Sequence, residues 1–203
     1  MSGIDLKSGG RRTLPRSLPT RRLLLRVPTL DDAEAVNEAI RESFTELNAW
    51  MEWAALEPTL EDTRTFCLDA IRQREAGSAC ALLMFDAADG SLVGATGFAS
   101  IDWGVPAFEI GYWCRTPLTG RGFVSEAAEA LTRHAFAVLG AARVFLRMDD
   151  RNARSYAVAE RLGFQLEGVL RHEVRDHHGR LRNTRVYSLL DANRIAGSLP
   201  ISP

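Results

Sequence analysis

The feature that most limits the possible folds of this sequence is a strand, a glycine-rich turn and a helix that follow one another within residues 107–139. Aromatic and apolar residues alternate along residues 107–115, which predicts a buried or half-buried strand. Gly120 and Gly122 punctuate a turn, and apolar residues recur with helical spacing from about Val124. A helix that begins after a glycine pair leaves its first N–H groups unpaired, which favours an anion such as phosphate. Ordinary strand-to-helix turns also use glycine, so the pattern alone leaves both interpretations open.

Length and composition indicate one globular domain without a general attraction for polyanions. The chain has 203 residues, 46% of them hydrophobic and 25% charged, with a net charge of -1. This balance favours neither nucleic acid nor a membrane surface as a partner, and no apolar run approaches the ~20 residues that span a bilayer. The three cysteines lack the spacing of a disulfide framework or a zinc site. We therefore expect a cytoplasmic protein without a metal, as a monomer or a homodimer.

The remaining pattern predicts helices packed on a mixed sheet, an α/β or α+β fold. Residues 1–19 are expected to be a mobile N-terminal extension, residues 20–191 the domain, and residues 192–203 a C-terminal tail. The predicted elements follow the usual start, stop and turn signals. They are a strand at 22–27, helices including 33–40 and 60–76, strands at 78–86, 91–101 and 107–115, a helix at about 124–139, a strand at 143–148, a helix at 153–162, and two strands within 165–190.

Two tryptophans, Trp50 and Trp53, lie close together before Pro58. The usual location of such side chains is the core, and we expect that here. The alternative is that they form a wall of a substrate cleft or of a subunit contact, because their rings are large and amphipathic.

Two motifs together resemble those of the GNAT acetyltransferases. EIGYW at 109–113 precedes TGRGFV at 119–124, and NARSYAVAERLGF follows at 152–164. With RRLLLRVPTLDDAEA, AWMEWA and GVLRHEVRDHHGRLRNTRVYSLL, the chain looks like the RimJ/RimL branch over about residues 20–191. The resemblance implies a GNAT-type acyl-CoA N-acyltransferase fold, a central twisted mixed sheet flanked by helices, which uses acetyl-CoA as cosubstrate. The turn departs from the family pattern at Thr119, where Gln or Arg is usual, and at Val124, where Gly or Ala is usual.

The resemblance also implies which residues hold acetyl-CoA. The strand would diverge from its neighbour and offer backbone amides to the pantetheine and the thioester carbonyl, around Trp113, Cys114 and Arg115. Asn152 would hold the pantetheine or cap the following helix, and these roles are compatible. Backbone amides of the turn would bind the pyrophosphate, with added charge from the arginine. These turn residues are Gly120, Arg121, Gly122, Phe123 and Val124.

For the chemistry, Glu109 is the best candidate for the general base, because burial in an apolar strand would raise its pKa. The alternative is a structural carboxylate, and Glu173 is a rival base. Ser155 matches the family's serine that protonates the leaving thiolate, or else it is an ordinary residue of the first helical turn. No histidine is placed beside Cys114, so we do not expect its thiol to be a nucleophile.

The leading hypothesis is an N-acetyltransferase that acts on a primary amine, and the acceptor is expected to be the α-amino group of a peptide or protein. The alternatives are an enzyme for small amines, such as polyamines or amine antibiotics, and a non-catalytic acyl-CoA-binding regulatory module. Nucleotide hydrolysis is disfavoured because no Lys followed by Ser or Thr comes after the glycines.

Overall fold

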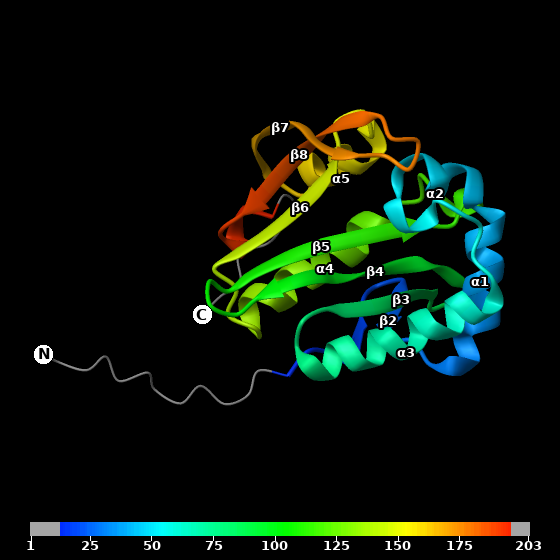
Figure 1. The fold of residues 1–203 in the computed structure, drawn as a ribbon. Coiled ribbons are helices and arrows are strands. Elements are labelled where there is room, and N and C mark those ends of the chain that lie inside the picture. The colour runs from blue at the N-terminus through cyan, green and yellow to red at the C-terminus, as the bar shows by residue number, and fades with distance from the viewer. Residues whose placement is uncertain (1–12, 196–203) are drawn as a thin grey trace, which may run out of the picture.

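The computed structural model describes residues 13–195, which form one eight-stranded sheet with helices on both faces (Figure 1). The strand order is β1-β2-β3-β4-β5-β6-β8-β7, and all neighbours are antiparallel except β5 and β6, which are parallel. The mixed α/β sheet predicted from the sequence is thereby confirmed. The strands are β1 Ser17–Pro19, β2 Leu23–Arg26, β3 Cys80–Asp86, β4 Leu92–Asp102, β5 Ala107–Cys114, β6 Arg143–Asp149, β7 Gln165–Arg175 and β8 Leu181–Leu189.

The helices divide into two groups. The first comprises α1 Ala33–Glu42, α2 Phe44–Trp50 and α3 Leu60–Ala76, and the second comprises α4 Phe123–Ala137 and α5 Ala153–Arg161. Figure 1 shows α3 on the near side of β3 and β4, with α4 behind the sheet. The described part of the chain also contains the short 3-10 helices η1 Leu30–Asp32, η2 Glu52–Ala54, η3 Thr116–Leu118 and η4 Ala192–Arg194.

Strand β3 shows why the sheet needs helices on both of its faces. Leu82 and Met84 belong to the core cluster that includes α4, whereas Leu83 between them belongs to the cluster that includes α1. All three side chains are fully buried. Because successive side chains of a strand point to opposite faces, a continuous apolar run requires cover on both sides.

Helix α3 begins and ends at the residues that the sequence predicts. The Thr59 hydroxyl accepts from the Asp62 N–H, and the Asp62 carboxylate accepts from the Thr59 N–H, which forms a reciprocal cap. At the other end Gly77 adopts φ 76°, a left-handed conformation that glycine tolerates best. These local signals fix the helix that forms one side of the groove described below.

The pairing of β5 with β6 is short. Ala107, Phe108 and Glu109 pair with residues 143–145, and beyond Glu109 the two strands of the described chain have no further register. The parallel strands therefore diverge over the C-terminal half of β5. This confirms the divergence that the family resemblance implies.

The predicted domain boundaries need correction at both ends. Residues 17–19 form β1 and pair with β2, and the Leu14 side chain is 4% exposed, so the ordered chain begins before residue 20. Ile195 is 3% exposed and packs in the core, so the tail does not begin at 192. Short apolar segments anchor both ends, a tertiary effect that composition does not reveal. Residues 1–12 and 196–203 of the predicted extensions lie outside the described residues.

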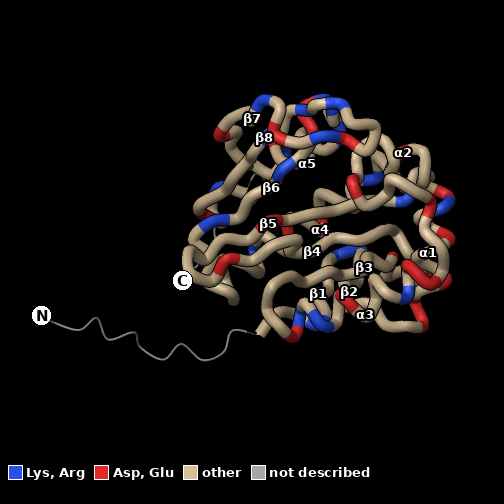
Figure 2. Tube along the Cα trace, viewed as in Figure 1, with Lys and Arg blue, Asp and Glu red and all other residues tan. Residues whose placement is uncertain are grey.

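Charged residues of both signs are interspersed over the fold (Figure 2), in keeping with the net charge of -1. Within residues 13–195, no helix is long and apolar enough to cross a membrane. The same part of the chain contains no group of three or more His, Cys, Asp or Glu residues able to hold a metal ion.

Candidate active site

The glycine turn has a backbone that only residues tolerant of positive φ adopt without strain. Gly120 has φ 78° and Gly122 has φ 81°. Gly122 is the N-cap of α4, and its carbonyl accepts the helix bond from the Glu126 N–H at 3.1 Å. The amides that precede Glu126 in α4 are therefore those that a helix leaves without intrahelical partners. Their position at the start of a 15-residue helix fits an anionic pyrophosphate.

An ion pair between Arg22, which directly precedes β2, and Glu126 of α4 supports this turn. The Arg22 Nε lies 2.7 Å from the Glu126 carboxylate, and Arg22 Nη1 donates to the Arg121 carbonyl at 3.0 Å. Its guanidinium also stacks over the Phe123 ring at 4.7 Å. Burial opposes ionisation of Glu126, but hydrogen bonds from Thr20 and Arg22 outweigh it and lower the pKa of that carboxyl. The contacts of Arg22 with Glu126, Arg121 and Phe123 thus fix the glycine turn against the residues before β2.

The C-terminal half of β5 contributes the predicted strand residues. Trp113 and Cys114 both lie beyond the last residue that pairs with β6. Burial raises the pKa of the Cys114 thiol to about 11, so this thiol is protonated and a poor nucleophile at neutral pH. Arg115 differs: its N–H donates to Val93, and its guanidinium binds Glu42 at 2.6 Å. The backbone N–H therefore bonds to β4 and the guanidinium to α1. This geometry does not support the predicted role of Arg115 in cofactor binding.

Asn152 and Ser155 lie at the start of α5, where that helix faces the diverging strands. The Asn152 side chain accepts from the Ser155 N–H at 3.1 Å and caps the helix. The Tyr112 hydroxyl, from β5, is 3.0 Å from the Ser155 carbonyl and 3.3 Å from its Oγ. Burial raises the pKa of Tyr112 to about 12, although the bond to Ser155 opposes the rise. Tyr112 thereby links the two sides of the opening.

Glu109 is the last residue of β5 that pairs with β6. The sequence pattern predicts that its side chain is buried, and the structure differs. Its side chain is half-buried, and its Oε2 accepts from the Ser100 hydroxyl at 3.0 Å. A bulge in β4 at Ala99 brings Ser100 opposite Glu109. The expected burial was wrong because this face of β5 borders an open groove. Glu109 shares the face with Gly111 and Trp113, two and four residues further on.

The rival base Glu173 has a different environment. A hydrogen bond from Thr184 is the main cause of its lowered pKa, with Arg147 as a further partner. A carboxylate held in this way is a weaker base. The geometry therefore favours Glu109 over Glu173 as the candidate base.

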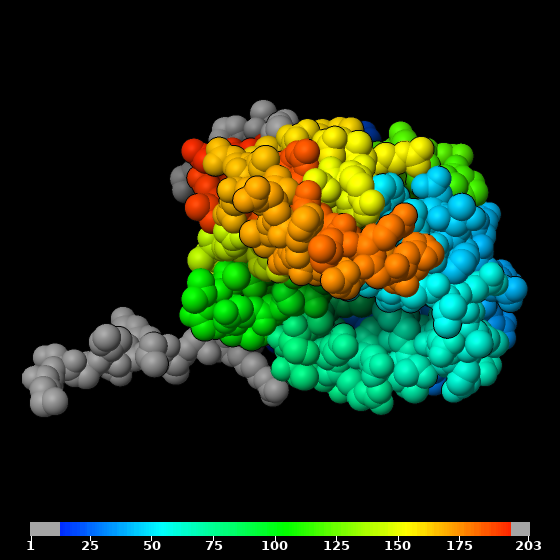
Figure 3. Space-filling model, turned by 45° about the horizontal axis from the view of Figure 1, so that its top comes forward, coloured from blue at the N-terminus to red at the C-terminus, as the bar shows by residue number. Residues whose placement is uncertain are grey.

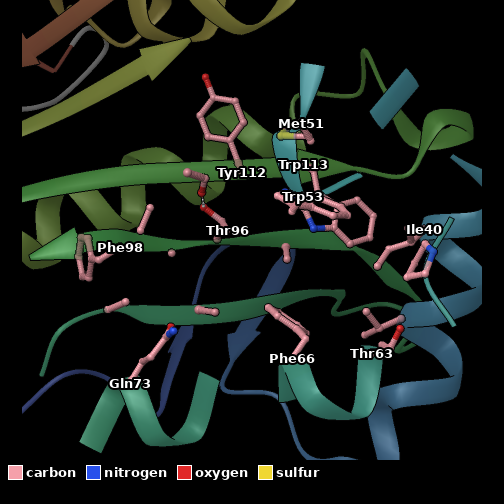
Figure 4. Close-up of a pocket in the computed structure, with 18 of the residues that line it drawn as sticks. Ile40, Met51, Trp53, Thr63, Phe66, Gln73, Thr96, Phe98, Tyr112 and Trp113 are labelled. Atoms are coloured by element: carbon pink, nitrogen blue, oxygen red, sulfur yellow. Dashed lines mark hydrogen bonds between the residues drawn. The ribbon is translucent and has the colours of Figure 1, made fainter. Parts of the chain in front are cut away.

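An apolar groove of about 510 Å³ lies between the first group of helices and the sheet. Figure 3 shows a hollow bounded by the β7–β8 hairpin in orange, α3 in teal and the α1–α2 region in cyan. Figure 4 shows Trp53 and Trp113 beside Met51 at one end, with Phe66 rising from α3. We define the apolar groove by these four residues and a floor of small residues on β3, β4 and β5, including Ala81, Ala99 and Gly111.

The groove corrects the expectation for the tryptophans. Trp53 is 52% exposed and its ring centroid lies 6.3 Å from that of Trp113, so its predicted place in the core is wrong and the alternative, a cleft wall, holds. Trp50 is half-buried. The short helices α2 and η2, which the sequence pattern did not predict, present Trp53 to the groove.

Three residues near the candidate site were missed by sequence reasoning. Tyr112 lies among apolar residues of β5 and was indistinguishable there from a core tyrosine. Arg22 and Glu126 are 104 positions apart, so no local pattern connects them. Glu126 offered one signal: it follows Phe123 by three residues, near the inward stripe of α4, where an acidic side chain requires a partner.

Three features define a coenzyme A-dependent acyltransferase. They are a glycine turn at a helix N-terminus, parallel strands that diverge beside it, and the polar start of a helix on the other side of the opening. Comparison with known proteins specifies the family. The model of the acetyltransferase (GNAT) domain matches residues 22–165, and the chain belongs to this family. It is an acetyl-CoA-dependent N-acetyltransferase of the RimJ/RimL-like branch.

The chain is 32% identical over 137 residues to the ribosomal-protein-serine acetyltransferase of Escherichia coli, covering 66% of this chain and 74% of that protein. Among solved structures, RimL, a ribosomal L7/L12 α-N-protein acetyltransferase in complex with coenzyme A, is 25% identical with a TM-score of 0.80, covering 86% of this chain and 97% of the other. The microcin C7 self-immunity acetyltransferase MccE, in complex with acetyl-CoA and AMP, has a TM-score of 0.78 at 24% identity. The match covers 84% of this chain and 93% of the MccE chain, and it shows a likeness of fold.

Proposed function

We propose that this enzyme acetylates the α-amino group of a peptide or protein N-terminus. The observation that carries the proposal is the open groove, which runs along β5 to the divergence from β6 and gives an acceptor access from outside. Two of the similar proteins named above, the ribosomal-protein-serine acetyltransferase and RimL, are named for ribosomal proteins, which supports a peptide acceptor. A polyamine would need several carboxylates, whereas Asp62 is the one acidic residue among those that line the groove in the described chain.

In the proposed reaction the acceptor nitrogen attacks the thioester carbon, the carbon–sulfur bond breaks, and the acetyl group forms an amide. Glu109, with its hydrogen bond from Ser100, would take the proton from the amine, directly or through water. Ser155 would donate its hydroxyl proton to the leaving thiolate and regain a proton from solvent as the products leave. Its Oγ lies 3.3 Å from the Tyr112 hydroxyl, which stays protonated at neutral pH.

The donor would bind with its pyrophosphate at Gly120, Arg121, Gly122, Phe123 and Val124. The left-handed glycines and the start of α4 support this assignment. Main-chain N–H groups of β5 near Trp113 and Cys114 would face the pantetheine and the carbonyl, where such donors stabilise developing negative charge. Asn152 would act through its cap of α5. A cytoplasmic location also remains part of the proposal, and the free thiols of Cys67 and Cys80 are compatible with it.

The test is a thiol-release assay with acetyl-CoA and peptides that have a free N-terminus. Mass spectrometry should find the acetyl group on the α-amine, and the same peptides with a blocked N-terminus but an internal lysine should not react. Acetylation of lysine or polyamines alone would contradict the proposal. Calorimetric titration with acetyl-CoA checks the donor site separately, and absence of binding at high micromolar concentration would refute that assignment.

A further inference from the structure

The walls of the apolar groove suit a flat apolar group. Trp53 and Trp113 are tilted by 57° to one another at one end, and Phe66 and Met51 add further apolar surface. Trp53 keeps 52% of its surface exposed, and Phe66 is also exposed. Large apolar side chains that remain exposed around a concave site commonly contact a ligand.

The floor of the groove consists of small residues from three adjacent strands. Ala81 of β3, Ala99 of β4 and Gly111 of β5 line it, and an added Cβ on Gly111 would lie 3.5 Å from the Ala99 Cβ. Small residues allow a ligand to approach the sheet between the tryptophans and α3. A volume of about 510 Å³ falls within the usual range of binding sites and accommodates an aromatic or long aliphatic side chain together with adjoining main chain.

The described residues that line the groove offer no positive charge to a ligand, and polar side chains among them are hydrogen-bonded within the protein. The Asp62 carboxylate accepts from the Thr59 hydroxyl and N–H, and the Thr96 hydroxyl donates to the Gly111 carbonyl at 3.0 Å. Among the described residues that line the groove, none is Lys, Arg or His. Arg182 of the neighbouring hairpin is bound to Glu52 and to Trp50. A phosphate or carboxylate on the acceptor would therefore be desolvated without a cationic partner.

From these contacts we propose that the acceptor is a peptide whose N-terminal residue is aromatic or large and aliphatic, with that side chain in the apolar groove. The inference deepens the proposed function and rests on it. Gly111 lies on the groove face beyond the last residue of β5 that pairs with β6, and as a glycine it has no side chain to cover the floor at that position. The amine would pass over Gly111 toward the thioester. The carboxyl group of the residue must be in an amide bond, because the lining has no cation for a free carboxylate.

The experiment measures kcat/KM for acetylation of tripeptide amides that differ only at the first residue. Phe-Ala-Ala-amide and Leu-Ala-Ala-amide should exceed Ser-Ala-Ala-amide and Asp-Ala-Ala-amide by at least about tenfold, as expected for a site that discriminates by apolar size. Free phenylalanine should be a poor acceptor. Equal rates for all four peptides would overturn the inference while leaving the proposed function intact. A higher rate with phenethylamine than with the phenylalanine peptide would overturn the peptide as occupant. Loss of all acetylation despite acetyl-CoA binding would count against the proposed function itself.

Two variants connect the preference to the groove. Ala99→Leu fills the floor and should raise the KM for the phenylalanine peptide about tenfold or more, with a smaller effect on the serine peptide. Trp53→Ala removes a wall and should reduce the preference for phenylalanine over serine. The matched controls are Ala87→Leu, in the exposed β3–β4 turn, and Leu56→Ala, a side chain that is 82% exposed and outside the groove. If Ala99→Leu folds, by circular dichroism, and keeps the wild-type preference, the side chain does not bind in this groove.

Discussion

The hydroxyl of Tyr112 lies 3.0 Å from the carbonyl oxygen of Ser155 and 3.3 Å from its Oγ, and so connects β5 to the start of α5. One hydrogen bond of this kind contributes about 0.5–1.5 kcal/mol. If it orients Ser155 toward the leaving thiolate, Tyr112→Phe should reduce kcat about two- to tenfold with little change in the KM for acetyl-CoA. Steady-state kinetics measures both constants.

The control for this variant is Tyr187→Phe, which removes another buried hydroxyl, one that donates to Glu160 at 2.8 Å. It should lower stability but leave kcat unchanged. Because the pKa of Tyr112 is raised to about 12, the wild-type pH profile should have no limb from this group below about pH 10. An unchanged kcat in Tyr112→Phe would show that the hydrogen bond between Tyr112 and Ser155 has a structural role and no role in turnover.

The two candidate bases give opposite expectations. Glu109→Gln should lower kcat by about 10²–10⁴, the usual contribution of general base catalysis. Glu173→Gln should retain most of the turnover, because the hydrogen bond from Thr184 and the ion pair with Arg147 lower the pKa of Glu173 and weaken it as a base. Rates over pH 5–10 with both variants distinguish these outcomes. Reversal of the two effects would move the base to β7.

The positive φ of Gly120 allows a test of the donor turn. Gly120→Ala should destabilise the protein by about 1–2 kcal/mol, because an L-residue adopts this conformation at that cost. It should also raise the KM for acetyl-CoA. Gly90→Ala is a close match, with φ 75° and no atom within 4 Å of an added Cβ, as at Gly120. It should lower stability to a similar degree without affecting the KM, and parallel KM increases in both variants would contradict a local role.

Asp149, at the end of β6, predicts how stability depends on pH. Its side chain is 1% exposed and binds Arg151 Nη2 at 2.6 Å. Burial alone would raise the pKa of Asp149, but the hydrogen bonds and charge of Arg151, together with the charge of Arg182, lower it overall. A folded-state pKa below the unfolded value of about 3.9 means that the stabilisation is present above that pH and is lost as pH falls through the folded value.

Asp149→Asn should therefore cost about 1.5–3 kcal/mol at pH 7, the usual value of hydrogen bonds to a charged group, and much less near pH 2–3. Urea unfolding at pH 7, 4 and 3 measures the difference. Asp69→Asn, which breaks an exposed pair with Arg72 on α3, should cost less than about 1 kcal/mol. An equal loss at pH 7 and at pH 3 would exclude the charge of Asp149 as the cause.

Much of the fold could be predicted because its signals are local. The Asp89-Gly90 pair between β3 and β4 is a strong local hairpin signal, and glycine at 120 and 122 predicted the turn before α4, since these conformations depend on few residues. The family resemblance was confirmed by the domain match over residues 22–165. The same reasoning found Asn152, whose cap of α5 is a local hydrogen bond.

The remainder depends on contacts between distant parts of the chain. Arg22 meets Glu126 across 104 positions, and Tyr112 meets Ser155 across 43. The exposure of Trp53 depends on the space that α1, α3 and the sheet leave between them, which periodicity does not describe. The half-buried state of Glu109 has the same origin, because whether a strand face is covered depends on helices far away in sequence.

The three-residue pairing of β5 with β6 also has a mechanical consequence. The sheet consists of a five-stranded part and a three-stranded part that share one narrow seam, while strands within each part pair over longer runs, as in the eleven residues of β4. A donor bound between the diverging ends of β5 and β6 would add contacts between the two parts of the sheet. If acetyl-CoA binds there as proposed, we expect the enzyme to be least rigid at the cosubstrate site, and bound acetyl-CoA to stiffen the connection between the two parts.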